Sequence, residues 1–310
     1  MDKKIIVLLV IGLLAVVGCT NQSQTKTTSK PFISGTNAIT FNFIEGSPPA
    51  EVYDGGSYPF EVTLNMENKG EYDVPKDKIS INLVGFYPLD FNNPNISKHP
   101  EEDLKKAYID SEGNVIPGAV TYVTFPGFNF AGNLSANNQY KIRANICYVY
   151  GTSAQADLCV LDDLTKTKDE VCKVTEKKIA QGSSAPVQIE NLEESIAGTD
   201  KITFSFEVVH RGSGLVSKEG TSCSDETIDK DKVWIEVNTG LPGLTCSGLS
   251  DGTATTGFTT LYGGKRMVRC TQDTNTPEAQ GKDFEKKVNI KAIFDYKEHK
   301  QVDLTVKHTT

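Results

Sequence analysis

Apolar and polar residues alternate with a period of two in several short segments of this chain. The alternation is clearest in residues 60–66 and residues 202–208, where every second residue is apolar. Successive side chains of a β-strand point to opposite faces, so this pattern places one face of each strand in a core and the other in water. A glycine follows each segment, at Gly70 and Gly212, and supplies a turn. The pattern therefore predicts half-buried strands.

Further segments repeat in the same order. Residues 76–83 resemble residues 230–237, and residues 142–148 resemble residues 290–296. Together with the two alternating segments, they make three matched pairs at similar offsets. The sequence therefore predicts the same domain twice.

The repeat predicts two domains, at residues 36–163 and residues 184–310, with residues 164–183 as a connector. Short strands separated by Gly, Pro and Asn are typical of β-sandwiches rather than of a parallel α/β sheet. The predicted fold class is all-β, with two tandem β-sandwiches. One short helix is predicted at residues 100–108, where three acidic residues in the first turn favour the helix dipole.

The N-terminal residues have the organisation of an export signal. Two lysines precede residues 5–17, which carry no polar side chain. This run suits a signal peptide and is short for a membrane-spanning helix, which needs about 20 residues. It leads to Cys19 in a pattern that resembles the lipobox of prokaryotic lipoproteins, with Val16 in place of the usual Leu. The resemblance implies removal of residues 1–18 and a diacylglycerol on the Cys19 sulfur.

Residues 19–35 are predicted to be a flexible tether, because most of them are polar and cannot bury a core. Two acyl chains anchor a protein stably, since each buried CH₂ contributes about 0.8 kcal/mol. We therefore expect the chain on the outer face of the cytoplasmic membrane, held by its lipid. An uncleaved signal that anchors the chain and free secretion are the alternatives.

The first half contains a motif that suggests a family. The alternating strand followed by Asn68-Lys69-Gly70 is similar to the cell-adhesion-related, immunoglobulin-like domains of bacteria and archaea. The second half departs from it, with His210-Arg211-Gly212 at the matching place. Cys147-Tyr148-Val149-Tyr150, with Cys159 and Cys172 beyond it, also resembles archaeal surface proteins with tandem sandwiches. The resemblance implies two immunoglobulin-like sandwiches on a cell surface and carries over no functional residue.

Charge and cysteine content narrow the function further. The formal net charge of −8 and the lack of a basic block argue against a nucleic-acid partner. An exported chain with an even number of cysteines beyond the lipidated one is expected to form disulfides. The candidates are Cys147, Cys159, Cys172, Cys223, Cys246 and Cys270.

Side-chain parity suggests pairings. Cys147 and Cys159 would share the outer face of a hairpin that turns near Ser153, so a bond between them is one prediction. A bond between Cys159 and Cys172 is the alternative.

In the second half a Cys246–Cys270 bond is favoured, because it would close strands on either side of the Gly263-Gly264 turn. Each half holds three of the six cysteines. If all six pair, an odd number of bonds must join the halves.

Residues that carry chemistry form no catalytic arrangement in the sequence. No nucleophile elbow, phosphate loop or zinc-protease motif occurs, so we predict no enzyme, no cofactor and no metal site. An acidic loop at residues 225–231 lacks the spacing of a Ca²⁺-binding EF-hand and is predicted to be a solvated turn. Four scattered histidines are expected to be exposed: His99, His210, His299 and His308.

Two kinds of surface residue remain as candidates. Asn95 and Asn133 begin Asn-x-Ser triplets that fit the N-glycosylation sequon. Trp234 is out of phase with Val233 and Ile235, so it is predicted on the outer face, where it could contact a ligand such as a glycan. The alternative is that Trp234 packs beneath a loop or the other domain.

These observations favour a non-catalytic surface lipoprotein that serves as an adhesion, spacer or protein-binding module. A carbohydrate- or cell-wall-binding protein and an accessory subunit of an envelope complex are the alternatives. The expected partners are the membrane, through the lipid anchor, and a protein or glycan ligand at the cell surface.

Overall fold

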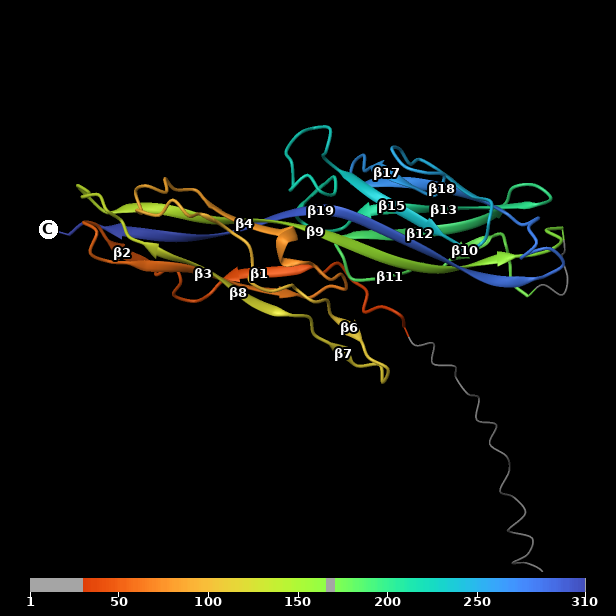
Figure 1. The fold of residues 1–310 in the computed structure, drawn as a ribbon, viewed down its shortest axis with the longest axis horizontal. Coiled ribbons are helices and arrows are strands. Elements are labelled where there is room, and N and C mark those ends of the chain that lie inside the picture. Colours follow the sequence, from red (N-terminus) through yellow and green to blue (C-terminus); the bar gives the residue numbers. More distant parts are fainter. Residues whose placement is uncertain (1–29, 166–170, 310) are drawn as a thin grey trace, which may run out of the picture. The chain divides into compact units, whose positions relative to one another are not determined.

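The computed structural model describes residues 30–165 and 171–309, and Pro31–Thr310 form one compact unit. Strands dominate this part of the chain (Figure 1), which confirms the predicted all-β class. Its helical content is the 3₁₀ turn η1 (Lys76–Lys78). The predicted signal peptide, Cys19 and residues 19–29 of the tether lie outside the described residues.

Two long strands run side by side through the whole unit. They are β9 (Asn138–Val160) and β19 (Phe284–Lys307), which pair antiparallel from Val160 opposite Phe284 to Asn138 opposite Val306. A strand of 23 residues extends over about 75 Å. The pair is the centre of a nine-stranded sheet, the shared sheet (Figure 1).

The other strands of the shared sheet lie along this pair. On the path they are β17 (Thr256–Thr260), β15 (Lys232–Asn238), β4 (Ile79–Val84) and β5 (Ser97–Lys98). Shorter partners are β2 (Glu51–Tyr53) and β14 (Leu215–Ser217) on β19, and β11 (Gln181–Gly182) on β9. The two halves of the chain therefore contribute strands to one sheet.

Two smaller sheets pack on the shared sheet. The first half supplies β1 (Ile39–Phe43), β3 (Phe60–Asn68) and β8 (Val120–Phe128). The second half supplies β10 (Glu176–Lys178), β12 (Val187–Ile196), β13 (Lys201–His210), β18 (Lys265–Asp273) and β16 (Leu244–Ser247). A separate hairpin joins β6 (Tyr108–Ile109) and β7 (Val115–Ile116).

One hydrophobic core fills the space between these layers. Even-numbered residues of β9 point into it from Ile142 to Val160 without a change of face, and most odd-numbered ones are less buried. The predicted hairpin at Ser153 is therefore wrong, because β9 continues straight through that position. Gly151 is required within the strand because a Cβ there would overlap the ring of Tyr72.

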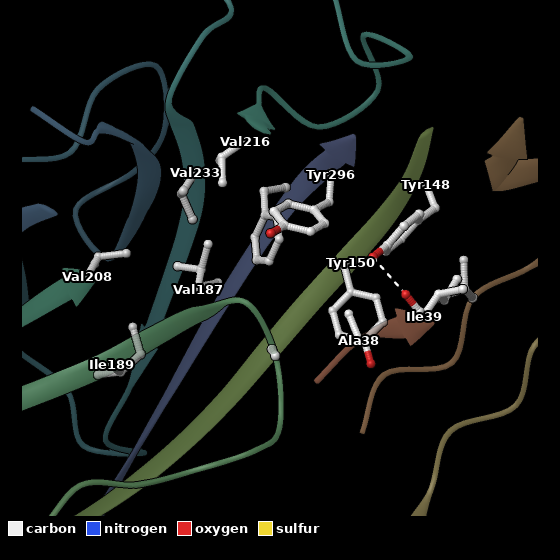
Figure 2. Close-up of a cluster of buried hydrophobic side chains, with 14 of the residues drawn as sticks. Ala38, Ile39, Tyr148, Tyr150, Val187, Ile189, Val208, Val216, Val233 and Tyr296 are labelled. Atoms are coloured by element: carbon white, nitrogen blue, oxygen red, sulfur yellow. Dashed lines mark hydrogen bonds between the residues drawn. The ribbon is translucent and has the colours of Figure 1, made fainter. Parts of the chain in front are cut away.

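Three buried tyrosines fill the core between the two smaller sheets (Figure 2). Tyr148 donates to the Glu298 carboxylate at 3.0 Å, and Tyr150 donates to Asn68 Oδ1 at 3.1 Å. The Tyr296 hydroxyl accepts the Gly214 N–H at 2.7 Å. Each hydroxyl thus has a partner, as buried polar groups require, and these bonds tie both halves to the central strand pair.

The Asn68-Lys69-Gly70 motif packs against the three buried tyrosines, which we call the tyrosine cluster. Asn68 is fully buried, and its Nδ2 donates to the carbonyls of Tyr72 and Leu104 at 2.8 and 3.0 Å. A Cβ on Gly70 would overlap the Tyr150 hydroxyl, and a Cβ on Gly212 would overlap the Tyr296 hydroxyl. The two turns therefore hold equivalent places, although His210 replaces Asn68 in the second.

The three matched segment pairs also occupy equivalent positions. The strands β3 and β13 are inner strands of the two smaller sheets, and β4 and β15 flank β9 and β19. However, the C-terminal part of β19 pairs with the N-terminal part of β9, and the C-terminal part of β9 pairs with the N-terminal part of β19. Each long strand therefore extends past the place where the two smaller sheets meet. The domain limits at residues 163 and 184 stay a prediction.

The helix predicted at residues 100–108 is wrong. Leu104 instead forms a two-way bridge with Val74, with hydrogen bonds of 2.9 and 3.1 Å. The Asp103 and Asp73 carboxylates accept the N–H groups of Lys76 and Lys106 across the same two segments. Burial of Leu104 and this pairing outweigh the helix preference of the acidic residues.

Three disulfides join the six cysteines of the described residues. Cys159–Cys172 and Cys246–Cys270 are both among the predicted pairings. The predicted Cys147–Cys159 bond is wrong, because Cys147 bonds Cys223 across 76 residues. This single bond joins the two halves, as the odd number of cysteines in each half requires.

Substituting Gly70→Ala should lower the free energy of unfolding by about 2–3 kcal/mol, because the new methyl group overlaps buried oxygen atoms. Urea unfolding measures the change. Gly132→Ala is the control, because its Cβ would lie 3.4 Å from Phe130 in ordinary contact. Equal stability of the two variants would contradict the packing described for the tyrosine cluster.

Candidate functional site

A cleft of about 300 Å³ opens on the outer face of the shared sheet. Its floor is Ser80, Cys147, Val149 and Asp295, from β4, β9 and β19. One wall comes from the first half: Tyr72, Pro75, Asp77, Lys78 and His99. The other wall comes from the second half: Glu219, Gly220 and Ser222. We call it the central cleft.

The first-half wall is positioned by the segment that leads from β3 to β4. Asn68 holds the Tyr72 carbonyl, and the Tyr72 ring lies over Gly151 of β9 and 5.5 Å from the Tyr150 ring. The η1 turn then places Asp77 and Lys78 at the cleft. His99 also lines the cleft, with Nδ1 against the Ile79 carbonyl.

The second-half wall belongs to residues 218–231, which we call the strap. The buried Asp295 carboxylate accepts three strap N–H groups, from Gly220, Thr221 and Cys223, at 3.1, 3.0 and 3.2 Å. The Cys147–Cys223 bond fixes the strap to β9. The cleft therefore depends on contacts between residues far apart in the sequence.

Carboxylates dominate the charge around the cleft. Partial burial, together with the nearby charges of Asp295 and Glu236, raises the pKa of Glu219. Burial and the charges of Glu219, Asp73 and Glu236 raise the pKa of Tyr72. The cleft thus offers hydroxyl groups, an aromatic ring and negative charge, which suit noncovalent binding.

The structure places Trp234 on the outer face of the shared sheet, half-buried between core-facing Val233 and Ile235. Its ring lies edge-on to Phe258, with centroids 4.8 Å apart, and Nε1 donates to Glu236 at 3.2 Å. The prediction of its face is confirmed. Its contact with a ligand stays a prediction.

The predicted acidic loop is part of the strap. Lys297 forms an ion pair with Asp225 at 2.9 Å, and the Asp229 N–H donates to the Glu226 carbonyl. The described residues with metal-ligand spacing are instead Cys147, Cys223 and Asp295, but their two sulfurs are bonded to each other. The sequence prediction of no metal site stays a prediction.

The remaining candidates are separate from the cleft. Asn95 and Asn133 are exposed, and their glycosylation stays a prediction. His299 and His308 are exposed, like His99 in the cleft wall, whereas His210 is half-buried beside Tyr296. The expectation for His210 is therefore wrong, and burial lowers its pKa.

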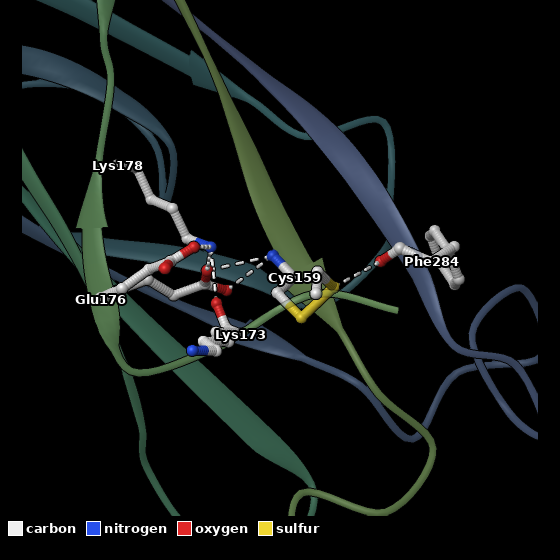
Figure 3. A network of polar contacts seen from close by, with 7 residues as sticks. Cys159, Lys173, Glu176, Lys178 and Phe284 are labelled. Atoms are coloured by element: carbon white, nitrogen blue, oxygen red, sulfur yellow. Dashed lines mark hydrogen bonds and ion pairs between the residues drawn. A yellow bond between two sulfur atoms is a disulfide. The ribbon is translucent and has the colours of Figure 1, made fainter. Parts of the chain in front are cut away.

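A second polar site is buried in the second half, away from the cleft residues. Both Glu194 carboxylate oxygens accept the Cys159 N–H, at 3.1 and 3.0 Å, and Lys178 Nζ lies 3.2 Å away. Figure 3 shows Lys178 directed toward Glu176 and the Lys173 carbonyl, close to Cys159. This network holds β10 and the Cys159–Cys172 loop against β12.

Burial acts differently on the two members of this network. It raises the pKa of Glu194 to about 7, because loss of water outweighs the bonds from Cys159 and Lys178. Burial alone would lower the pKa of Lys178, but Glu176 and Glu194 together raise it. Lys178 therefore keeps its charge through its second partner, whereas Glu194 titrates near neutrality.

No protein-family model matches this chain, and no curated protein matches its sequence. Among the described residues, no helix has the length and apolar character needed to cross a membrane.

The raised pKa of Glu194 predicts a pH dependence of stability. Between pH 4.5 and about 7 the folded chain binds more protons at this site than the unfolded chain, so the free energy of unfolding falls as pH rises. The Glu194→Gln variant should lose this contribution, on the order of 2–3 kcal/mol across the window. Urea unfolding at several pH values measures it. Parallel curves for wild type and variant would contradict the prediction.

Proposed function

We propose that this chain is a non-catalytic, membrane-anchored surface lipoprotein, whose two halves form a rigid spacer and protein-binding module. The observation that carries the proposal is the strand pair of β9 and β19, which runs through both halves. Adjacent domains joined by a linker usually move relative to one another. A continuous hydrogen-bonded pair resists such bending.

Two further features support rigidity. The tyrosine hydroxyls bond residues of both halves, including Asn68 and Gly214. The Glu71 carboxylate also accepts N–H groups from Ile33, Ser34 and Ser184, which joins the start of the first half to the segment before β12. A spacer needs this stiffness to hold a binding surface at a fixed distance from the point where the tether begins.

The location rests on the sequence and the disulfides together. Residues 1–18 have the organisation of a signal peptide, and Cys19 follows as the proposed lipidated residue. Disulfides persist in oxidising compartments and are rare in the cytosol. These features support the proposal that the chain lies on the outer face of the cytoplasmic membrane. The central cleft is the proposed contact site for a protein partner.

The finer fold is part of the same proposal. Two smaller sheets facing one larger sheet, with matching Asn68-to-Gly70 and His210-to-Gly212 turns, support two immunoglobulin-like sandwiches whose last strands overlap. The adhesion-related resemblance of the first motif supports the same assignment.

The anchor can be tested in cells that express the full chain. Wild-type protein should be in the membrane fraction, lack residues 1–18 and carry the added mass of lipid. Protease added to intact cells should digest it. Cys19→Ala should abolish the lipid mass and release most of the protein from the membrane fraction, whereas Thr20→Ala should leave both unchanged.

An unmodified wild-type chain outside the membrane fraction would contradict the lipoprotein proposal. Intact-mass spectrometry of the two fractions separates this outcome from an uncleaved anchor, which would retain residues 1–18.

A further inference from the structure

The strap has almost no hydrophobic anchorage. Of residues 218–231, only Cys223 is buried, and Ile228 is 67% exposed. Segments with few buried apolar contacts open at low free-energy cost. The strap therefore depends on its disulfide and on polar contacts for its position.

The strap backbone is also strained next to its attachment point. Ser222 and Cys223 both have left-handed backbone conformations, with φ of 53° and 57°. Residues other than glycine and asparagine disfavour this region. Other residues keep a left-handed conformation only where surrounding contacts hold them in it. Here those contacts are the bond to Cys147 and the Asp295 carboxylate.

The other two disulfides lie in a different setting. Cys246 and Cys270 are opposite each other on paired strands β16 and β18, so backbone hydrogen bonds keep them together without the S–S bond. Cys159 is fully buried in the core, and the Glu194 carboxylate binds its N–H. Each disulfide joins a buried cysteine to a part-exposed one, and Cys147 is the part-exposed cysteine that lines the central cleft.

From these observations we propose that Cys147–Cys223 is a redox-releasable latch, which closes the strap over the outer face of the shared sheet. A dithiol reductant opens it from the cleft. One of its thiolates attacks Cys147 Sγ and breaks the S–S bond, and Cys223 leaves as a thiolate that takes a proton from water. The second thiol then displaces Cys147 as a thiol, so the reductant becomes a disulfide and the protein gains two electrons and two protons.

Opening the latch removes one wall of the cleft. Glu219, Gly220 and Ser222 leave with the strap, and Cys147, Val149 and Asp295 become accessible on the sheet. The central strand pair stays intact because the backbone pairing between β9 and β19 does not involve the strap. The latch therefore switches the shape of the binding surface and not the fold. This inference does not depend on the lipid anchor.

The test uses the oxidised full chain and increasing dithiothreitol. Differential alkylation followed by peptide mass spectrometry should label Cys147 and Cys223 before the four cysteines of the other two disulfides. Hydrogen exchange of peptides from the strap should then accelerate at least about tenfold, with β9 and β13 unchanged. Simultaneous reduction of all three bonds, or an equally protected strap after reduction, would overturn the latch.

A paired variant provides the matched control. Cys147→Ser/Cys223→Ser should show the fast strap exchange without any dithiol, whereas Cys246→Ser/Cys270→Ser should keep the strap protected. If the first variant does not fold, the wild-type reduction series still decides between the outcomes.

Discussion

The antiparallel pairing of β9 with β19 is the constraint on which the rest of the structure depends. The two strands stay in one register from Phe284 opposite Val160 to Val306 opposite Asn138. Because side chains alternate in a strand, this register fixes the core face of both strands along their full length. The two smaller sheets then cover that face, and loops such as the strap cross the other face.

Where the two smaller sheets meet over the long strand pair, buried backbone polar groups need hydrogen-bond partners. The turns that end β3 and β13 bring backbone polar groups into the core, and these groups need partners. The Tyr296 hydroxyl supplies one partner by accepting the Gly214 N–H. Asn68 supplies another by accepting the Gly70 N–H, and the Tyr150 hydroxyl donates to the same Asn68 oxygen. Glycines at 70 and 212 make room for the hydroxyls. The packing where the two smaller sheets meet therefore depends on the same strands, β9 and β19, that keep the shared sheet continuous.

Much of this fold could be predicted from local pattern. Alternation identified β3 and β13, and the repeat identified β4 with β15. The pattern failed where tertiary contacts override local preference. Gly151 and Ser153 look like turn residues, yet they lie within β9, because the glycine accommodates Tyr72.

The central cleft was beyond sequence reasoning for a related reason. Its walls come from segments that only the shared sheet brings together, and Asp295 lies in an alternating strand where nothing marks it as a buried acceptor for the strap. The odd number of cysteines per half did indicate a bond between the halves, but local parity could not identify Cys223 as the partner of Cys147.

The most direct test of the central claim is the distance between two labels on β9, one on the part that the first-half sheet covers and one on the part that the second-half sheet covers. Arg143 and Asp157 are both exposed on the outer face and can be replaced by spin-labelled non-natural residues, which leaves the disulfides intact. Pulsed electron paramagnetic resonance should give one narrow distribution centred at about 45 Å. A broad or two-peaked distribution would mean that the halves hinge, and it would contradict a continuous strand through both.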